Sequence, residues 1–497
     1  MPSQTTPDAF GFAFDNSYAR DLDGLYVSWQ GAKAVDPAIV RLNRALAAEL
    51  GLDADALDTP EGARVLCGDT APKGAAPLAM AYAGHQFGGF SPQLGDGRAL
   101  LLGEVIDRAG QRRDIHLKGS GRTPFSRGGD GKAVLGPILR EYLIGEAMHA
   151  LHIPTTRALA AVRTGEAVLR ENGPAPGAVL ARVASSHLRV GTFQFFAARG
   201  EQDKLQQLLD YAIARHDPDL IGAPDRALLF LNRVIARQAK LIAGWMSVGF
   251  IHGVMNTDNM AISGETIDYG PCAFMDAYDP ATVFSSIDRQ GRYAYGNQPG
   301  IAVWNLARLA ETLLPFLADD DDTAIAIATE AIGGFAPLYD AAWLRLMRGK
   351  LGLTTAEAGD MALAQGFLAV MEGKGVDFTN AFRSLSGVVN VGPTALRAQF
   401  TDPDAARDWQ NAWQDRLTRD PADPVKRAAA MDAVNPAYIP RNHLVEAALE
   451  AAGLGDLTPF DRLLDVLSDP FKARPGLQAY AQPAPESFGN YQTFCGT

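Results

Sequence analysis

The chain has 497 residues, 47% of them hydrophobic and 21% charged, as expected for a globular protein of two or three domains or for one large two-lobed enzyme. A net charge of −12 argues against nonspecific binding to nucleic acid or to anionic membranes, and no apolar run has the length of a membrane span. The N-terminal sequence lacks the basic start and apolar core of a secretory signal. Only three cysteines are present, so we expect a reducing, cytoplasmic location.

The first two hundred residues mix helices with strands. Residues 37–50 carry apolar side chains at helical spacing and predict a helix. Residues 98–105 and 114–118 are strand candidates joined by a glycine-containing turn, and residues 156–170 and 177–184 predict two more strands. Between these pairs, Gly136-Pro137 opens a helix that runs to about Leu151.

Amphipathic helical spacing dominates after residue 200, and seven helices are predicted: 204–214, 225–248, 300–317, 323–347, 355–372, 404–417 and 443–452. The exception is residues 249–275, where a loop and a hairpin are predicted around the turn at 263–265. The fold class predicted is therefore α+β. We expect a mixed segment over 1–200, a helical segment over 201–475 and a flexible tail over 476–497.

The most informative stretch is HGVMNTDN at 252–259, followed by DYG at 268–270. Kinase-like phosphotransferases hold Mg²⁺ with an Asn on the catalytic loop and with the Asp of a following Asp-Phe-Gly. Asn259 and Asp268 have the matching separation, but Val254 stands where the usual base would be. Either the site is inactive or it performs different chemistry on the same nucleotide. Asp258 is the nearest carboxylate that could activate an acceptor hydroxyl, although it could also only brace the loop.

Several further residues could bind phosphate. Gly95 and Gly97 stand in a turn before a strand, where a backbone without Cβ atoms can approach a phosphate closely. Lys118 ends the next strand, and Glu141 on the following helix is the partner we choose for it over Glu146, which faces another side of the helix.

A second glycine-rich loop at 126–132 contains Asp130 and Gly131 and could form a phosphate-binding nest or a mobile surface loop. Arg182 and Arg189 lie in an otherwise apolar stretch. They could bind phosphate through their planar guanidinium groups or form structural salt bridges.

Taken in order, these pieces resemble the selenoprotein O family, also called the YdiU family, of pseudokinase protein adenylyltransferases. The resemblance covers nearly the whole chain. It is carried by YAGHQFGGF at 82–90, QLGDGR at 93–98, HLKGSGRTPFSR at 116–127, REYL at 140–143, IPTTRAL at 153–159, HGVMNTDN at 252–259 and DYGP at 268–271.

The resemblance implies a protein-kinase-like bilobal fold that binds ATP in a flipped orientation and transfers AMP to Ser, Thr or Tyr hydroxyls of target proteins. Self-AMPylation is a further alternative. By motif, the ATP site would contain Gly95, Gly97, Arg98, Lys118, Asp130, Gly131, Arg182, Arg189 and Asp268, with Glu141 paired to Lys118. Asn259 and Asp268 would hold Mg²⁺ or Mn²⁺, and Asp258 would be the base.

The family also tends to carry a redox-active residue near the C-terminus, which Cys495 matches, and a bridge from Cys495 to Cys272 is a hypothesis. Two other functions stay open at this point. An ordinary phosphotransferase is disfavoured by Val254. An inert nucleotide-binding scaffold or redox adaptor is disfavoured by the complete set of Lys118, Glu141, Asn259 and Asp268.

Overall fold

The computed structural model describes residues 9–170 and 173–494. Its largest sheet has eight strands, which pair antiparallel throughout. The strands run across the sheet in the order β1 (Tyr26–Ser28), β3 (Leu78–Met80), β6 (Ala99–Ile106), β7 (Arg112–Lys118), β10 (Gly173–Ala184), β9 (Arg157–Arg170) and β2 (Ala38–Leu42), and β8 (Ala133–Val134) also pairs with β10. Helix α5 (Leu135–Ala150) packs on β9 and β10. With its many helices, the chain has the predicted α+β class.

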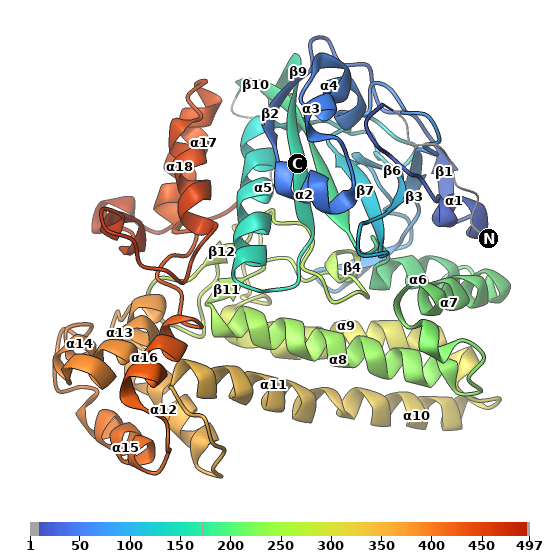
Figure 1. Ribbon diagram of the computed structural model, residues 1–497. Coiled ribbons are helices and arrows are strands. Elements are labelled where there is room, and N and C mark those ends of the chain that lie inside the picture. Colours follow the sequence, from blue (N-terminus) through green and yellow to red (C-terminus); the bar gives the residue numbers. More distant parts are fainter. Residues whose placement is uncertain (1–8, 171–172, 495–497) are drawn as a thin grey trace.

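Helices make up most of the chain after β10. Figure 1 shows the long helices α8, α9, α10 and α11 running below the sheet, and α17 and α18 standing beside α5. The helices are α1 (Ser17–Asp21), α2 (Arg44–Leu50), α3 (Ala54–Leu57), α4 (Pro60–Leu66), α6 (Val190–Ala197), α7 (Gln202–His216), α8 (Arg226–Ser247), α9 (Gln298–Leu313), α10 (Asp321–Gly333), α11 (Phe335–Lys350), α12 (Asp360–Met371), α13 (Phe378–Val391), α14 (Thr394–Arg397), α15 (Arg407–Thr418), α16 (Pro424–Asp432), α17 (Asn442–Gly453) and α18 (Thr458–Leu467).

Six of the seven helices predicted after residue 200 are present, with ends shifted by a few residues. The single helix predicted over 323–347 is wrong, because α10 ends at Gly333 and α11 begins at Phe335. The helix predicted from residue 355 begins only at Asp360. Among the described helices after β10, α6, α13, α14, α16 and α18 were not predicted.

The helix predicted over 37–50 is wrong in its first half. Residues 38–42 form β2, which pairs with β9 through neighbours such as Ile39 and Val162. Adjacent β-branched side chains at Ile39 and Val40 favour a strand that a partner can cover. The helix starts only after Asn43, whose side chain accepts a hydrogen bond from the Leu46 N–H at 3.1 Å and caps α2.

The predicted hairpin region forms between α8 and α9. Strand β11 (Phe250–Ile251) pairs antiparallel with β12 (Ala273–Phe274), and Met260 bridges Thr266 around the turn at Gly264. Between β11 and this bridge lies the 3₁₀ turn η2 (Thr257–Asn259). In the part of the chain that the structure describes, no helix combines the length and the apolar character needed to cross a membrane.

Lys350 ends α11 with its side chain buried, its Nζ atom 4.5 Å from the centre of the Phe382 ring. Burial lowers the pKa of this ammonium group to about 7. An unfolded chain keeps a lysine protonated to about pH 10, so between pH 7 and about 10 the unfolded state binds more protons than the folded state. This one group therefore makes the free energy of unfolding rise with pH across that window, by up to about 1.4 kcal/mol per pH unit.

Lys350→Met is expected to remove this contribution, because methionine fills the same space beside Phe382 without a titratable group. The variant should melt at a higher temperature than the wild type at pH 7, and the difference should shrink at pH 9. Scanning calorimetry of both proteins at the two pH values measures it. A difference that is equal at both values would contradict a lowered pKa at Lys350.

Candidate functional site

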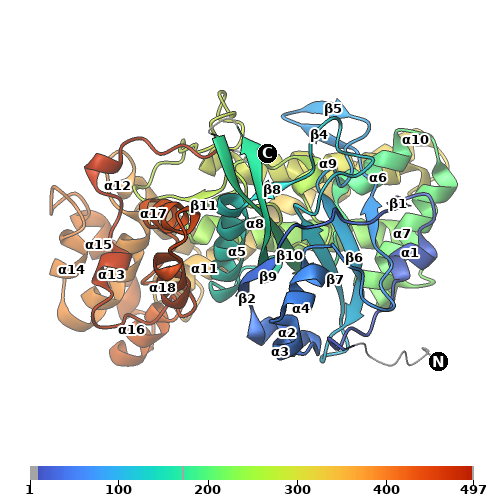
Figure 2. The same cartoon turned by 90° about the horizontal axis from the view of Figure 1, so that it is seen from above.

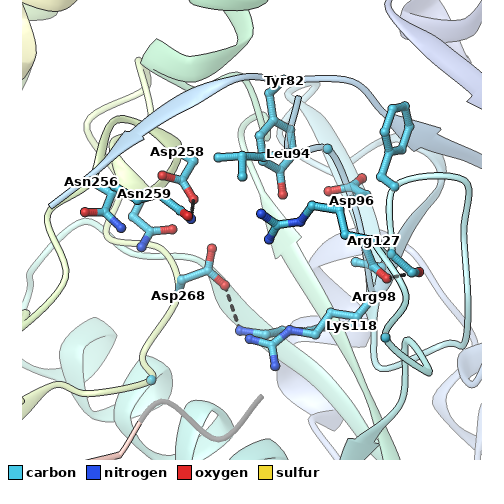
Figure 3. Close-up of a pocket in the computed structure, with 18 of the residues that line it drawn as sticks. Tyr82, Leu94, Asp96, Arg98, Lys118, Arg127, Asn256, Asp258, Asn259 and Asp268 are labelled. Carbon is cyan, nitrogen blue, oxygen red and sulfur yellow. Dashed lines mark hydrogen bonds and ion pairs between the residues drawn. The ribbon is translucent and has the colours of Figure 1, made fainter. Parts of the chain in front are cut away.

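A cavity of about 420 Å³ lies between the sheet and the segment 254–271. Figure 3 shows Asp258, Asn259 and Asp268 on one side of it and Arg98 and Lys118 on the other. The residues predicted from the sequence that line it are Gly95, Gly97, Arg98, Lys118, Asp130, Gly131, Arg182, Arg189, Asp258, Asn259 and Asp268. Val254, which stands where a kinase base would be expected, lines the same cavity. The structure thus gathers residues that lie up to 173 positions apart in the sequence.

Lys118, Arg182, Glu141 and Asp268 form a compact cluster of two cations and two anions. Lys118 Nζ lies 2.5 Å from Glu141 Oε2 and 2.7 Å from Asp268 Oδ1. Arg182 Nη1 lies 2.9 Å from the other Glu141 oxygen and 2.9 Å from the same Asp268 oxygen. Glu141 therefore joins two basic residues on neighbouring strands, whereas Glu146 pairs with Arg157 at 2.8 Å.

The local fold explains why these charges meet. Lys118 pairs with Leu180 in the β7–β10 ladder, so Arg182, two residues beyond Leu180, projects from the same face of the sheet. Helix α5 crosses this face and brings Glu141 to both cations. The result is a pair of basic groups held in fixed positions by buried ion pairs.

Asp268 stays ionised because of this cluster. Burial alone would raise the pKa of its carboxyl, but the charges of Lys118, Arg182 and Arg189 outweigh burial and hold the pKa well below its ordinary value. Its backbone has a φ of +64°, in the left-handed region that non-glycine residues rarely adopt. Surrounding contacts therefore hold Asp268 in a conformation that costs free energy, as is common at functional sites.

Asp258 lies on the same side of the cavity as Asp268 but in a different environment. Burial raises the pKa of its carboxyl to about 6. Its Oδ2 accepts a hydrogen bond from Gln86 Nε2 at 3.2 Å, and its buried Oδ1 has no hydrogen-bond partner among the described residues. A Cβ atom at Gly84 would lie 3.0 Å from that Oδ1, a tight contact that glycine avoids. Asp258 is thus a buried carboxylate with one oxygen unpaired among the described residues and a pKa suited to accepting a proton near neutral pH.

Arg189 is a third buried cation in the cavity lining, and its Nη1 lies 4.0 Å from Asp96 Oδ1. Its guanidinium group is buried, donates to the His187 carbonyl at 3.2 Å and lies over the Tyr82 ring at 4.4 Å. Its Nε has no hydrogen-bond partner within the described ranges. Buried charged donors are normally paired, so this group has capacity for a ligand oxygen.

Both glycine-rich segments line the cavity, and each contains a glycine that the local backbone requires. Gly95 has a φ of +70°, and a Cβ atom there would clash with the Phe125 ring at 2.3 Å. Gly131 has a φ of +69°, and a Cβ atom there would clash with the Gly121 carbonyl oxygen at 2.2 Å. Asp130 pairs with Arg170 at 2.8 Å and accepts from the Lys132 N–H, which fixes the loop beside the cavity.

The donor atoms at this site are compatible with Mg²⁺ or Mn²⁺. No three His, Cys, Asp or Glu side chains of the described residues gather into a complete metal site. The Asn259 amide nitrogen donates to the Val254 carbonyl at 3.1 Å, which leaves its amide oxygen as a ligand atom. That oxygen and the ionised Asp268 carboxylate are hard donors of the kind that Mg²⁺ takes together with substrate phosphates. The residues present therefore fit a metal that arrives with a nucleotide.

Two residues that hydrogen-bond to the predicted site residues, His116 and Gln86, were not predicted from the sequence as site residues. His116, buried on β7, lies with Nε2 3.0 Å from Asp96 Oδ2, and its Nδ1 accepts from Arg182 Nε at 3.3 Å. Burial lowers the pKa of His116, and a neutral ring protonated on Nε2 satisfies both contacts. Gln86 is the other, through its bond to Asp258. Neither contact has a sequence signal, because the partners come from distant strands or loops.

The two cysteines cannot be assessed together, because Cys495 lies outside the described residues. Cys272 is buried, and burial raises the pKa of its thiol to about 11. Within the expected tail, Thr493 is buried and donates through Oγ1 to the Pro271 carbonyl at 2.7 Å. The chain thus passes beside the neighbour of Cys272 two residues before Cys495, and the Cys272–Cys495 bridge stays a prediction.

Comparison with known proteins gives a consistent result. Residues 11–468 match the family model described as "Protein adenylyltransferase SelO". A relative from Cereibacter sphaeroides named "Protein nucleotidyltransferase YdiU" is 61% identical over 487 residues, which cover 98% of this chain and 100% of the relative. Relatives of the same name from Rhodopseudomonas palustris and Methylorubrum populi are 59% and 58% identical, each covering 98% of this chain and 99% of the relative. The chain therefore belongs to the SelO/YdiU family and is a nucleotidyltransferase.

Proposed function

We propose that this protein transfers AMP from ATP to serine, threonine or tyrosine hydroxyl groups of acceptor proteins and releases pyrophosphate. The observation that carries the proposal is the contrast between Val254 and Asp258 in one cavity. A valine cannot take a proton from a hydroxyl, whereas Asp258 presents a buried carboxylate oxygen without a partner among the described residues. The printed name of the matching family, protein adenylyltransferase, supports the same reaction.

In this reaction the acceptor oxygen forms a bond to the α-phosphorus of ATP. The bond from that phosphorus to the oxygen that bridges it to the β-phosphate breaks, and the electron pair leaves with pyrophosphate. The acceptor proton passes to the carboxylate of Asp258. Negative charge grows on the leaving group, and Lys118, Arg182 and Arg189, which line the cavity, would neutralise it.

Within this proposal, Gly95, Gly97, Arg98, Asp130 and Gly131 line the nucleotide, and Glu141 holds Lys118 and Arg182 in place. Asn259 and Asp268 would hold Mg²⁺ or Mn²⁺, which supplies Lewis-acid neutralisation of the phosphate oxygens when bound. We further propose that the sheet with α5 and the helices after residue 200 correspond to the two lobes of a kinase-like fold. ATP would lie in it with its phosphates reversed, and the reaction would take place in the cytoplasm.

Labelled ATP tests the proposal. The purified protein is incubated with Mg²⁺ or Mn²⁺ and with ATP labelled at the α-phosphate or, separately, at the γ-phosphate, and label bound to protein is counted. We expect incorporation from the α-position only, together with release of pyrophosphate. Incorporation from the γ-position alone would identify a phosphotransferase and would reject AMP transfer.

A further inference from the structure

A small hairpin projects beside the cavity and has no place in the nucleotide chemistry described above. Strands β4 (Gly84–Gln86) and β5 (Gly89–Ser91) pair with Gln86 opposite Gly89, so Phe87 and Gly88 form the two-residue turn. Figure 2 shows the β4–β5 hairpin extending from the body of the molecule, away from the large sheet. Gln86 and Phe87 line the same cavity as Asp258.

Three hydrogen bonds fasten this hairpin to the loop that carries Asp258. The His85 N–H donates to Thr257 Oγ1 at 2.6 Å, and the Phe87 N–H donates to Asn256 Oδ1 at 3.0 Å. Between them, Gln86 Nε2 donates to Asp258 Oδ2 at 3.2 Å. These bonds fix the position of the hairpin relative to the carboxylate. Gln86 occupies Asp258 Oδ2, and the buried Oδ1 keeps no hydrogen-bond partner among the described residues.

Phe87 is an unusual residue for its position. Its φ is +52° and that of Gly88 is +87°, as in the tight hairpin turns whose first position normally holds asparagine, aspartate or glycine. A bulky aromatic residue is disfavoured there. Phe87 is nevertheless 38% exposed, and its ring makes a T-shaped contact with Tyr293 at 5.2 Å between ring centres. The backbone conformation of this turn favours asparagine over phenylalanine, so the turn alone does not explain an exposed aromatic ring at this position.

The position of Phe87 relates it to the acceptor. It follows Gln86, which contacts the proton-accepting carboxylate, whereas Lys118, Arg182 and Asp268 gather elsewhere in the cavity as the charged cluster. Ile287, which is 52% exposed, also lines the cavity. Because Asp258 is buried in a cavity whose lining includes the exposed residues Phe87 and Ile287, we expect an acceptor side chain that reaches Asp258 to enter past these two residues. Residues beside that side chain would then lie against Phe87 and Ile287.

We propose that Phe87, together with Ile287, is a specificity-determining contact for the acceptor protein. The partner segment is an extended stretch of polypeptide that carries an apolar side chain next to the hydroxyl residue to be modified. This inference rests on the proposed AMP transfer and names the class of acceptor that the site takes. Gln86 acts as a positioning residue for Asp258.

The test uses the full-length protein, α-labelled ATP and a library of synthetic peptides in which one serine, threonine or tyrosine is flanked by varied residues. The variant is Phe87→Asn, which suits the turn geometry and should therefore fold well. The control is Phe90→Thr, which removes the other exposed aromatic ring of the hairpin, 43% exposed and outside the cavity lining. Peptide KM, kcat and the Kd for ATP are measured for all three proteins.

We expect the wild type to favour peptides with apolar residues beside the hydroxyl. Phe87→Asn should raise the KM for those peptides roughly tenfold, in the range of a lost apolar contact, and should lose the preference. Its Kd for ATP should match the wild type, and Phe90→Thr should behave as the wild type throughout.

Four results would overturn the inference. They are an unchanged KM and preference in Phe87→Asn, an equal loss in Phe90→Thr, weaker ATP binding in Phe87→Asn as expected for a ring that stacks on the base, and self-labelling from α-labelled ATP without labelling of any peptide. The last result leaves AMP transfer intact and removes only the extended acceptor. Incorporation of γ-label alone by the wild type removes the proposed function and this inference together.

Discussion

Asp258→Asn is expected to lower the rate of AMP transfer by about 10²–10⁴-fold, the usual contribution of a positioned general base. The change keeps the shape of the side chain. It replaces one of the two carboxylate oxygens with an NH2 group, so the side chain loses its negative charge and can no longer take the acceptor proton. Burial raises the pKa of Asp258 to about 6, so the wild-type rate should be lost as pH falls through that value and should level off above it. Rates of α-label transfer measured across pH for both proteins provide the comparison.

The residual rate of Asp258→Asn should lack the inflection near pH 6, because the titrating group is gone. Binding of ATP provides the control, since Asp258 belongs to the acceptor side of the cavity and its loss should leave the Kd for ATP nearly unchanged. A variant that transfers AMP at the wild-type rate would show that another group takes the proton.

Asp268→Asn is expected to reduce transfer by about 10²–10³-fold, comparable to the loss of a preorganised charged or polar group at a reacting centre. The substitution removes the negative charge that Lys118 and Arg182 contact at 2.7 and 2.9 Å and weakens the proposed metal site. Asparagine tolerates the left-handed backbone at this position better than most residues, so the fold should survive. Transfer of α-label at increasing Mn²⁺ concentration measures the effect.

Asp268→Ala serves as the matched comparison, because it removes the same charge and also strains the backbone at a φ of +64°. The two variants should lose transfer to a similar degree, whereas Asp268→Ala should melt at a lower temperature than Asp268→Asn. Retention of activity in Asp268→Asn would mean that the carboxylate charge is not needed for transfer. A loss confined to Asp268→Ala would point to the backbone alone.

Much of the helical part could be predicted because amphipathic spacing is a local property. Helices such as α7 and α8 show it clearly, and their predicted ranges lie within or close to the observed ones. The failures have identifiable causes. Residues 38–42 have apolar side chains that suit either a helix or a strand, and pairing with β9 decides for the strand. Gly333 and Gly334 interrupt a helical pattern that otherwise continues from α10 into α11.

The candidate site divides along the same line. Lys118, Glu141, Asn259 and Asp268 could be located from motif order and spacing, and the structure brings their side chains to one place. The contact between Gln86 and Asp258 joins residues 172 positions apart, so no local sequence pattern predicts it. Backbone conformation is equally invisible in a single sequence. The positive φ of Phe87 contradicts the local preference of phenylalanine, and aspartate adopts the φ of Asp268 too seldom for the sequence to predict it, so only the structure reveals both.

The two sides of the cavity are anchored differently, and this affects how activity is lost on mild heating or in denaturant. Arg182 stands on β10, which is hydrogen-bonded to β7 on one side and to β9 on the other, whereas Asp258 sits on a single 3₁₀ turn held largely by side-chain contacts. Interior strands open only with the whole domain, while short turns open locally at far lower free energy. Mild heating or denaturant therefore acts first on the turn. We expect the proton acceptor Asp258 and the proposed metal ligand Asn259 to lose their positions together, while Arg182 on the interior strand keeps its place, so catalysis should fail before the sheet opens.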